Sequence, residues 1–224
     1  RCIMRKGCVR IEKIEIENFK NVKNGHIILK NNRKNYKSSI LGIYGQNGSG
    51  KTALIDAIML LKLALCGQVI PPQYADYIHV DAENAKLKFE LSVEDPENGT
   101  AYVTVYEFKI RKEQNDSTSN LSESENTKAV IYDEILSSSY THDNNKYRMS
   151  TLINTNAKGA FSPRNKYQEF VGKDKELATS LEVAKRLASA TSRSFIFSKE
   201  LLSVIKENCK QPIYIDLIEL MVQY

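Results

Sequence analysis

One run of consecutive residues has the types and spacing of a phosphate-binding loop: Gly45-Gln46-Asn47-Gly48-Ser49-Gly50-Lys51-Thr52. It fits the Walker A pattern G-x-x-x-x-G-K-[ST]. Glycines allow the backbone to bring its N–H groups up to phosphate oxygens. Lys51 would place its ammonium on the β- and γ-phosphates, and the Thr52 hydroxyl would hold Mg²⁺. The run therefore predicts a site for a nucleotide and its magnesium ion.

The segments on both sides of the loop have the composition that this motif needs. Residues 40–44 are a short apolar run, which predicts a buried strand entering the loop. Residues 53–65 predict a long helix, apolar on nearly all sides, with Gly67 as its C-cap. The positive end of that helix would face the bound anion. A strand, a glycine-rich loop and a helix in this order support the Walker A interpretation.

The composition is ordinary for a globular chain: 224 residues, 42% hydrophobic and 26% charged. No apolar run reaches the ~20 residues that a membrane-spanning helix needs, so we expect no membrane span. The cysteines are scattered, without paired metal-ligand spacing, at Cys2, Cys8, Cys66 and Cys209. This pattern favours reduced thiols and a cytoplasmic protein.

Positive charge is concentrated at the start of the chain. The net charge is +5, and residues 1–37 hold eleven Lys or Arg against three Glu, a local +8 that leaves −3 for the rest. A basic region of this kind can contact nucleic acid. Solvated strand faces and turns are the simpler interpretation, because a charge count alone is weak evidence.

The segments before the loop predict two short strands. Isoleucine and glutamate alternate over residues 14–17, a period of two that indicates a half-buried strand ending at Phe19. Asn24-Gly25 predicts the turn into a second strand over residues 26–30.

Residues 85–153 predict an antiparallel β meander. The clearest strand period of the chain is the alternation of polar residues with Leu87, Phe89, Leu91 and Val93. A turn at 95–99 leads to a returning strand at 102–110. Residues 129–136 and 146–153 predict a further hairpin. Such a meander argues against a plain alternating β-α-β fold.

From residue 174 the hydrophobic period becomes helical. One helix shows an apolar face made by Leu177, Leu181, Ala184, Leu187 and Ala188. Ser198 or Lys199 opens a second helix through Asn208, and Pro212 lies near the start of a third that runs to Tyr224. Because the helical pattern continues to the last residue, we expect a chain cut from a longer protein.

These elements predict an α/β fold of the phosphate-loop NTPase class in three parts. Residues 1–84 would form the nucleotide-binding core, and residues 85–172 an antiparallel β subdomain of the same lobe. Residues 173–224 would begin a helical segment that is truncated here.

The opening of the chain resembles the ABC/SMC/RecF-like ATPases, and among them the bacterial AAA-type ATP-binding proteins related to the OLD family. The resemblance is carried by the loop at 45–52 and by Ile14-Glu15-Ile16-Glu17-Asn18-Phe19-Lys20. It is specific over residues 11–66 and loose over 85–224, where strand spacing agrees but no motif does. The fold it implies is the N-terminal lobe of such an ATPase.

The resemblance implies ATP as the nucleotide, with Mg²⁺. In such families the Asn-Phe-Lys/Arg turn lies near the nucleotide, which makes Asn18 and Lys20 secondary binding candidates. The alternative is that Phe19 is a core residue and Lys20 is solvated. The resemblance also implies a homodimer in the full-length protein that couples nucleotide state to DNA or to a DNA-repair or phage-defence effector.

Other family motifs are missing or out of place. No LSGGQ-like signature stretch is present, and the histidines are isolated. An apolar run precedes Asp133-Glu134, as in a Walker B motif, whose aspartate helps to hold Mg²⁺. This makes Asp133 a weak metal candidate and Glu134 a weak catalytic candidate, because family Walker B motifs follow a helical arm and this pair lies in a predicted hairpin.

Three functional hypotheses remain open. In the first, the chain is the N-terminal part of an ATPase that dimerises around ATP, and alone it binds Mg-ATP weakly with negligible hydrolysis. In the second, it is a complete small NTPase that uses Asp133 and Glu134. In the third, the nucleotide regulates a module that binds DNA or a partner without significant hydrolysis.

Overall fold

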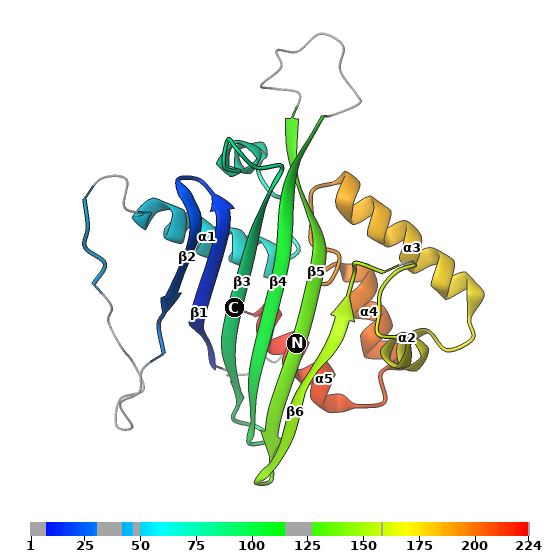
Figure 1. Cartoon of the computed structure of the whole chain (residues 1–224). Helices are drawn as coiled ribbons and strands as arrows, with labels where there is room; N and C mark the ends of the chain where they lie inside the picture. The colour runs from blue at the N-terminus through cyan, green and yellow to red at the C-terminus, as the bar shows by residue number, and fades with distance from the viewer. Residues whose placement is uncertain (1–7, 31–41, 47–49, 115–126, 158, 224) are drawn as a thin grey trace.

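A computed structural model of the protein describes residues 8–30, 42–46, 50–114, 127–157 and 159–223. A six-stranded sheet in the order β2-β1-β3-β4-β5-β6 forms its centre. In Figure 1, α1 and α5 cross behind this sheet, and α2, α3 and α4 gather beside β5 and β6. The predicted α/β architecture with an antiparallel sheet and a helical segment is confirmed.

Every neighbouring pair of strands in the sheet is antiparallel. The strands are β1 (Cys8–Phe19), β2 (Val22–Ile28), β3 (Asn84–Asp95), β4 (Thr100–Gln114), β5 (Thr127–His142) and β6 (Asn145–Asn154). The predicted meander is therefore confirmed as β3 to β6. Because β3 also pairs with β1, the same sheet continues across residue 84.

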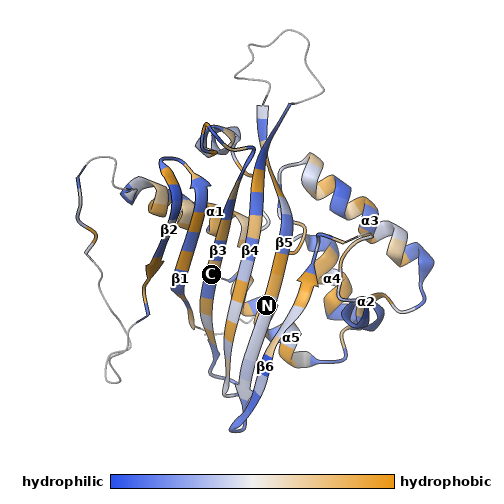
Figure 2. Cartoon of the chain, in the orientation of Figure 1, coloured by the Kyte–Doolittle hydropathy of each residue, from blue (hydrophilic) through white to orange (hydrophobic). Residues whose placement is uncertain are grey.

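The sheet buries one face through the period-two pattern of its strands. On β3, Leu87, Phe89 and Leu91 are fully buried, whereas Lys88 and Glu90 between them are half-buried. Figure 2 shows the corresponding alternation of hydrophobic and hydrophilic bands along β3 and β4. The buried side chains pack against the helices in one hydrophobic core.

The helices are α1 (Lys51–Leu65), η1 (Pro72–Tyr77), α2 (Arg164–Val171), α3 (Lys175–Ala190), α4 (Lys199–Asn208) and α5 (Pro212–Val222). Those predicted at 53–65 and in the last fifty residues are confirmed. Asp174 caps α3 by accepting the N–H groups of Glu176 and Leu177, and Ser198 caps α4. The short helix α2 was not predicted, because its apolar period covers too few residues.

The turn predicted at Asn24-Gly25 is wrong. Phe19 pairs directly with Val22, so the chain reverses at Lys20 and Asn21. Gly25 instead lies within β2, opposite Ile16. The physical reason is tertiary: Phe19 is fully buried, and the Lys20 N–H donates to the Tyr77 carbonyl oxygen, so contacts with a distant segment hold the turn here.

The buried strand predicted at 40–44 is also wrong over its described part. Residues 42–46 have no regular secondary structure, and Tyr44 is 93% exposed. A strand is stable when a neighbouring strand takes its N–H and C=O groups. Within the described part of the chain, no strand pairs with 42–46. Residues 40 and 41 lie outside the described residues.

The predicted C-cap at Gly67 is confirmed as a Schellman arrangement. Gly67 has a φ of 59°, and its N–H donates to the carbonyl oxygen of Ala64 at 3.0 Å. The N–H of Gln68 donates to the carbonyl oxygen of Leu63 at 2.9 Å. These bonds satisfy carbonyl groups at the end of α1 that would otherwise lack partners.

Substituting Gly67 with alanine is expected to destabilise the fold by about 2 kcal/mol or more. Alanine at this position would have to keep the left-handed backbone conformation of Gly67, and its Cβ would lie 2.8 Å from the carbonyl oxygen of Phe197. Gly99→Ala is the matched control, because Gly99 has a φ of 67° with nothing within 4 Å of the added Cβ. Denaturant unfolding should give a clearly larger loss for Gly67→Ala, and equal losses would contradict the steric part of this argument.

Candidate nucleotide site

Gly50, at the end of the predicted phosphate loop, leads into α1 with a backbone conformation that the glycine pattern predicts. Gly50 is the N-cap of α1 and has a φ of 88°, a conformation that glycine adopts at little cost. The ammonium of Lys51 donates hydrogen bonds to the carbonyl oxygens of Gly45 at 2.5 Å and Gln46 at 2.7 Å. Lys51 therefore folds back over the start of the loop. Asn47, Gly48 and Ser49 lie outside the described residues.

The N-terminus of α1 is suited to an anion. Gly50 has no side chain with which to cap the helix, and no acidic residue lies in the first turn. By contrast, α3 and α4 are capped by Asp174 and Ser198. The partial positive charge of α1 and the Lys51 ammonium lie together, an arrangement that favours bound phosphate.

A cavity of about 370 Å³ lies beside the loop, with Gly50 and Lys51 in its wall. Its other walls come from β1, from Ile43 and Tyr44, and from the stretch of β2 around His26. Gly50 approaches β2 closely, because an added Cβ would lie 3.1 Å from a methyl group of Val22. The loop therefore borders a hollow with apolar walls and a few polar groups, as ligand sites commonly do.

The turn after β1 brings Lys20 to the helix that follows the loop. The Lys20 ammonium pairs with the carboxylate of Asp56 on α1, and its side chain is 21% exposed. Phe19 is fully buried, as in the alternative interpretation, but Lys20 is not solvated as that interpretation expected. The carbonyl oxygen of Asn18 accepts the N–H of His79 at 2.9 Å, which fixes the start of this turn.

The candidate side-chain ligand for magnesium is the Thr52 hydroxyl. In the residues that the structure describes, no group of three or more His, Cys, Asp or Glu could hold a metal ion. Thr52 is exposed on the first turn of α1, where its hydroxyl can reach an ion that is otherwise bound by phosphate oxygens and water. This fits Mg²⁺, which commonly keeps several waters and binds through substrate phosphates.

Asp133 and Glu134 point to different surroundings. The register between β4 and β5 shifts at this point, and Asp133 has a φ of 50°. The Asp133 carboxylate accepts a hydrogen bond from the Lys109 ammonium at 3.1 Å. Glu134, which is 2% exposed, instead turns into the core.

The buried carboxylate of Glu134 is held by three donors. It accepts hydrogen bonds from the Tyr106 hydroxyl at 2.7 Å, from the Phe195 N–H at 2.8 Å and from the Ser194 hydroxyl. Burial raises the pKa of Glu134 above its ordinary value, and the hydrogen bonds from Ser194, Tyr106 and Phe195 oppose that rise. The contacts tie β5 to the segment that precedes α4.

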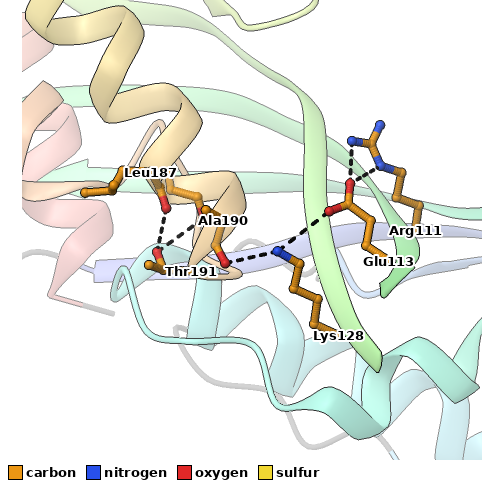
Figure 3. Close-up of polar contacts among 7 residues, drawn as sticks. Arg111, Glu113, Lys128, Leu187, Ala190 and Thr191 are labelled. Carbon is orange, nitrogen blue, oxygen red and sulfur yellow. Dashed lines mark hydrogen bonds and ion pairs between the residues drawn. The ribbon is translucent and has the colours of Figure 1, made fainter. Parts of the chain in front are cut away.

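Asp133 and Glu134 line a second cavity, of about 550 Å³, whose wall does not include Lys51. Figure 3 shows part of its rim, where the Glu113 carboxylate lies 2.6 Å from the Arg111 guanidinium. The Lys128 ammonium lies 3.7 Å from Glu113 and donates to the Ala190 carbonyl oxygen at 3.1 Å. These contacts join β4 and β5 to the end of α3. Among the described residues, the structure thus places Asp133 and Glu134 at a cavity other than the one that Gly50 and Lys51 border.

The sequence predicted no role for two residues that contact Lys20, namely Asp56 and Tyr77. The Lys20 ammonium pairs with Asp56 and lies 4.0 Å from the centroid of the Tyr77 ring. A signal for Asp56 was present, because it follows Thr52 by four residues on a helix and so shares its face. No local pattern indicates Tyr77.

Two further sequence expectations concern cysteines and membranes. The thiols of Cys8, Cys66 and Cys209 are free, and Cys2 lies outside the described residues. In the part of the chain that the structure describes, no helix is both long and apolar enough to span a bilayer.

The glycine-rich loop, the helix it enters and the adjoining sheet define a lobe of a P-loop nucleoside triphosphatase. A family model described as "AAA domain" matches residues 13–217. The chain therefore belongs to this AAA domain family, and the predicted kinship with ABC/SMC/RecF-like P-loop ATPases is confirmed.

One curated relative is the DNA replication and repair protein RecF of Deinococcus radiodurans, which is 32% identical over 85 residues. That match covers 38% of this chain and 21% of RecF. A solved structure described as the recombination mediator protein RecF-ATPrS in the RecFOR pathway is 20% identical, with a TM-score of 0.31. It covers 95% of this chain, which spans 50% of that structure. The chain thus spans about a fifth of the curated relative.

Proposed function

We propose that the chain binds Mg-ATP through residues 45–52 and is the N-terminal part of an ATPase. The observation that carries this proposal is the start of α1, where the Lys51 ammonium and an N-terminus without an acidic cap lie together at a glycine-rich loop. Negative charge is stabilised there by both groups. Membership of the AAA domain family supports the same assignment.

In this proposal each site residue has a distinct role. The backbone of residues 45–50 cradles the phosphates, Lys51 neutralises the β- and γ-phosphates, and Thr52 binds Mg²⁺. Bound Mg²⁺ would supply charge neutralisation across the β- and γ-phosphates. Lys20 is a secondary phosphate ligand, supported by its position against α1. Asn18 contributes through the turn that carries Lys20.

We further propose that the longer protein is a cytoplasmic homodimer that closes around ATP and couples this closure to DNA or to an effector protein. The support is the likeness to RecF, which is described as a DNA replication and repair protein. Residues 1–84, 85–172 and 173–224 would be the core, the β subdomain and the first helices of that lobe.

The test is to measure binding of Mg-ATP and steady-state hydrolysis on this chain. We expect weak binding and negligible turnover, because Asp133 and Glu134 line a cavity other than the one bordered by Lys51. Robust turnover that Glu134→Gln abolishes would overturn this expectation and support a complete NTPase. Turnover that Glu134→Gln leaves unchanged would exclude that second role for Glu134.

A further inference from the structure

The turn that carries Lys20 is fixed to the segment after η1. The Lys20 N–H donates to the Tyr77 carbonyl oxygen at 2.5 Å, and Phe19 forms an isolated β-bridge with Ile78. The Phe19 ring also meets the Tyr77 ring edge to face, with centroids 5.9 Å apart. The backbone position of Lys20 is therefore set by residues more than fifty positions away in the sequence.

The side chain of Lys20 is held from two sides. Its ammonium pairs with the Asp56 carboxylate and lies 4.0 Å from the centre of the Tyr77 ring. Both charged side chains are 21% exposed. A lysine at an open surface samples many rotamers, whereas an ion pair and a cation–π contact together restrict this one.

The Asp56 end of this arrangement is attached to the phosphate-loop helix. Asp56 follows Thr52 by four residues, so the two side chains share a face about one helical turn apart. The Lys20 ammonium is thus paired with a residue one helical turn along α1 from Thr52, to which the proposed function assigns Mg²⁺. If Thr52 holds Mg²⁺ as in the proposed function, the phosphates that share this ion would lie on the same face of α1 as the Lys20–Asp56 pair.

We propose that Asp56 and Tyr77 are positioning residues that hold the Lys20 ammonium toward the γ-phosphate end of the nucleotide. This inference rests on the proposed function. Asp56 acts through Lys20 and does not touch the nucleotide, and Tyr77 also anchors the turn through its backbone.

Electrostatics alone makes the opposite prediction for Asp56. Removing a carboxylate near bound phosphate reduces repulsion, so Asp56→Asn would strengthen binding if Asp56 had no positioning role. If Asp56 orients Lys20, the same substitution weakens binding, because a disordered lysine must be ordered by the nucleotide. The sign of the change therefore separates the two accounts.

The experiment compares Mg-ATP and Mg-ADP affinities by calorimetry for the unmodified chain, Lys20→Met, Asp56→Asn and the double variant. We expect Lys20→Met to weaken ATP binding about tenfold, as for loss of one charge-assisted hydrogen bond. Asp56→Asn should weaken it in the same direction, and the double variant should lose no more than Lys20→Met. ADP binding should change less than ATP binding in each case.

Lys23→Met and Asp81→Asn are the matched controls. These residues form a separate ion pair at 3.1 Å, with 70% and 68% of their side chains exposed, between β2 and the segment that follows η1. Neither control should alter the ratio of ATP to ADP affinity. Thermal unfolding of each variant checks that the fold is retained.

The possible failures are distinguishable. If Lys51→Ala leaves ATP binding intact, the proposed function itself is wrong. If Lys51→Ala removes binding but Asp56→Asn strengthens it or leaves it unchanged, the positioning role is overturned and the proposed function stands. Equal losses for ATP and ADP would also overturn it, because they would indicate a purely structural contribution.

Discussion

Replacing Lys51 with alanine is expected to weaken Mg-ATP binding by about a hundredfold or more, as for removal of a strong charged contact to phosphate. Two effects add. The ammonium that would neutralise the phosphates is lost, and so are its hydrogen bonds to the carbonyl oxygens of Gly45 and Gln46. The loop then has less support for the shape that presents its N–H groups.

Calorimetric titration of Mg-ATP into the chain measures this effect. Lys62→Ala is the matched control, because Lys62 is an exposed lysine in the last turn of the same helix. This substitution removes the same charge. Its affinity for Mg-ATP should stay near that of the unmodified chain. Lys51→Ala binding that matches Lys62→Ala would refute the assignment of the loop.

Glu134→Ala is expected to destabilise the fold by about 3 kcal/mol, within the range for breaking a buried polar network. The substitution leaves the hydroxyls of Tyr106 and Ser194 and the N–H of Phe195 without their acceptor inside the core. It also opens a cavity between β5 and the segment before α4. Loss of this contact should loosen the helical part from the sheet.

Urea unfolding with matched m-values measures the loss in the free energy of unfolding. Asp133→Asn is the adjacent control, since its pair with Lys109 is partly exposed and is worth at most about 1 kcal/mol. The loss for Glu134→Gln should fall between the losses for these two variants. Glutamine keeps one oxygen as an acceptor for the two hydroxyls, but it places its NH₂ donor, or a second side-chain conformer, opposite the Phe195 N–H. A midpoint for Glu134→Ala equal to that of Asp133→Asn would contradict the structural role.

The unfolding of Glu134→Ala and the turnover of Glu134→Gln together separate the structural hypothesis from the catalytic hypothesis on Glu134. If Glu134 is structural, its removal lowers the free energy of unfolding and leaves the nucleotide affinity of the folded chain unchanged. If Glu134 is catalytic, Glu134→Gln lowers turnover while the folded fraction stays constant. The three hydrogen bonds from core residues favour the structural role.

The sequence by itself determined the features that depend on neighbours along the chain. The Walker A prediction rests on eight consecutive residues, and the helix behind them follows from the apolar continuation to Gly67. The meander follows from period-two alternation, and the starts of α3 and α4 from the change of period near Asp174 and from Ser198. Short-range spacing encodes each of these, because backbone geometry repeats every two or 3.6 residues.

Only the tertiary structure decided which distant side chains meet. Lys20 and Asp56 are 36 positions apart, and Glu134 and Ser194 are 60 apart, so no local period relates them. The turn after Phe19 is held by burial of that ring and by backbone contacts with Tyr77 and Ile78, which overrode the local preference of Asn24-Gly25. Residues 42–44 have the apolar composition of a strand, but a strand also needs a partner, and pairing is a property of the assembled sheet.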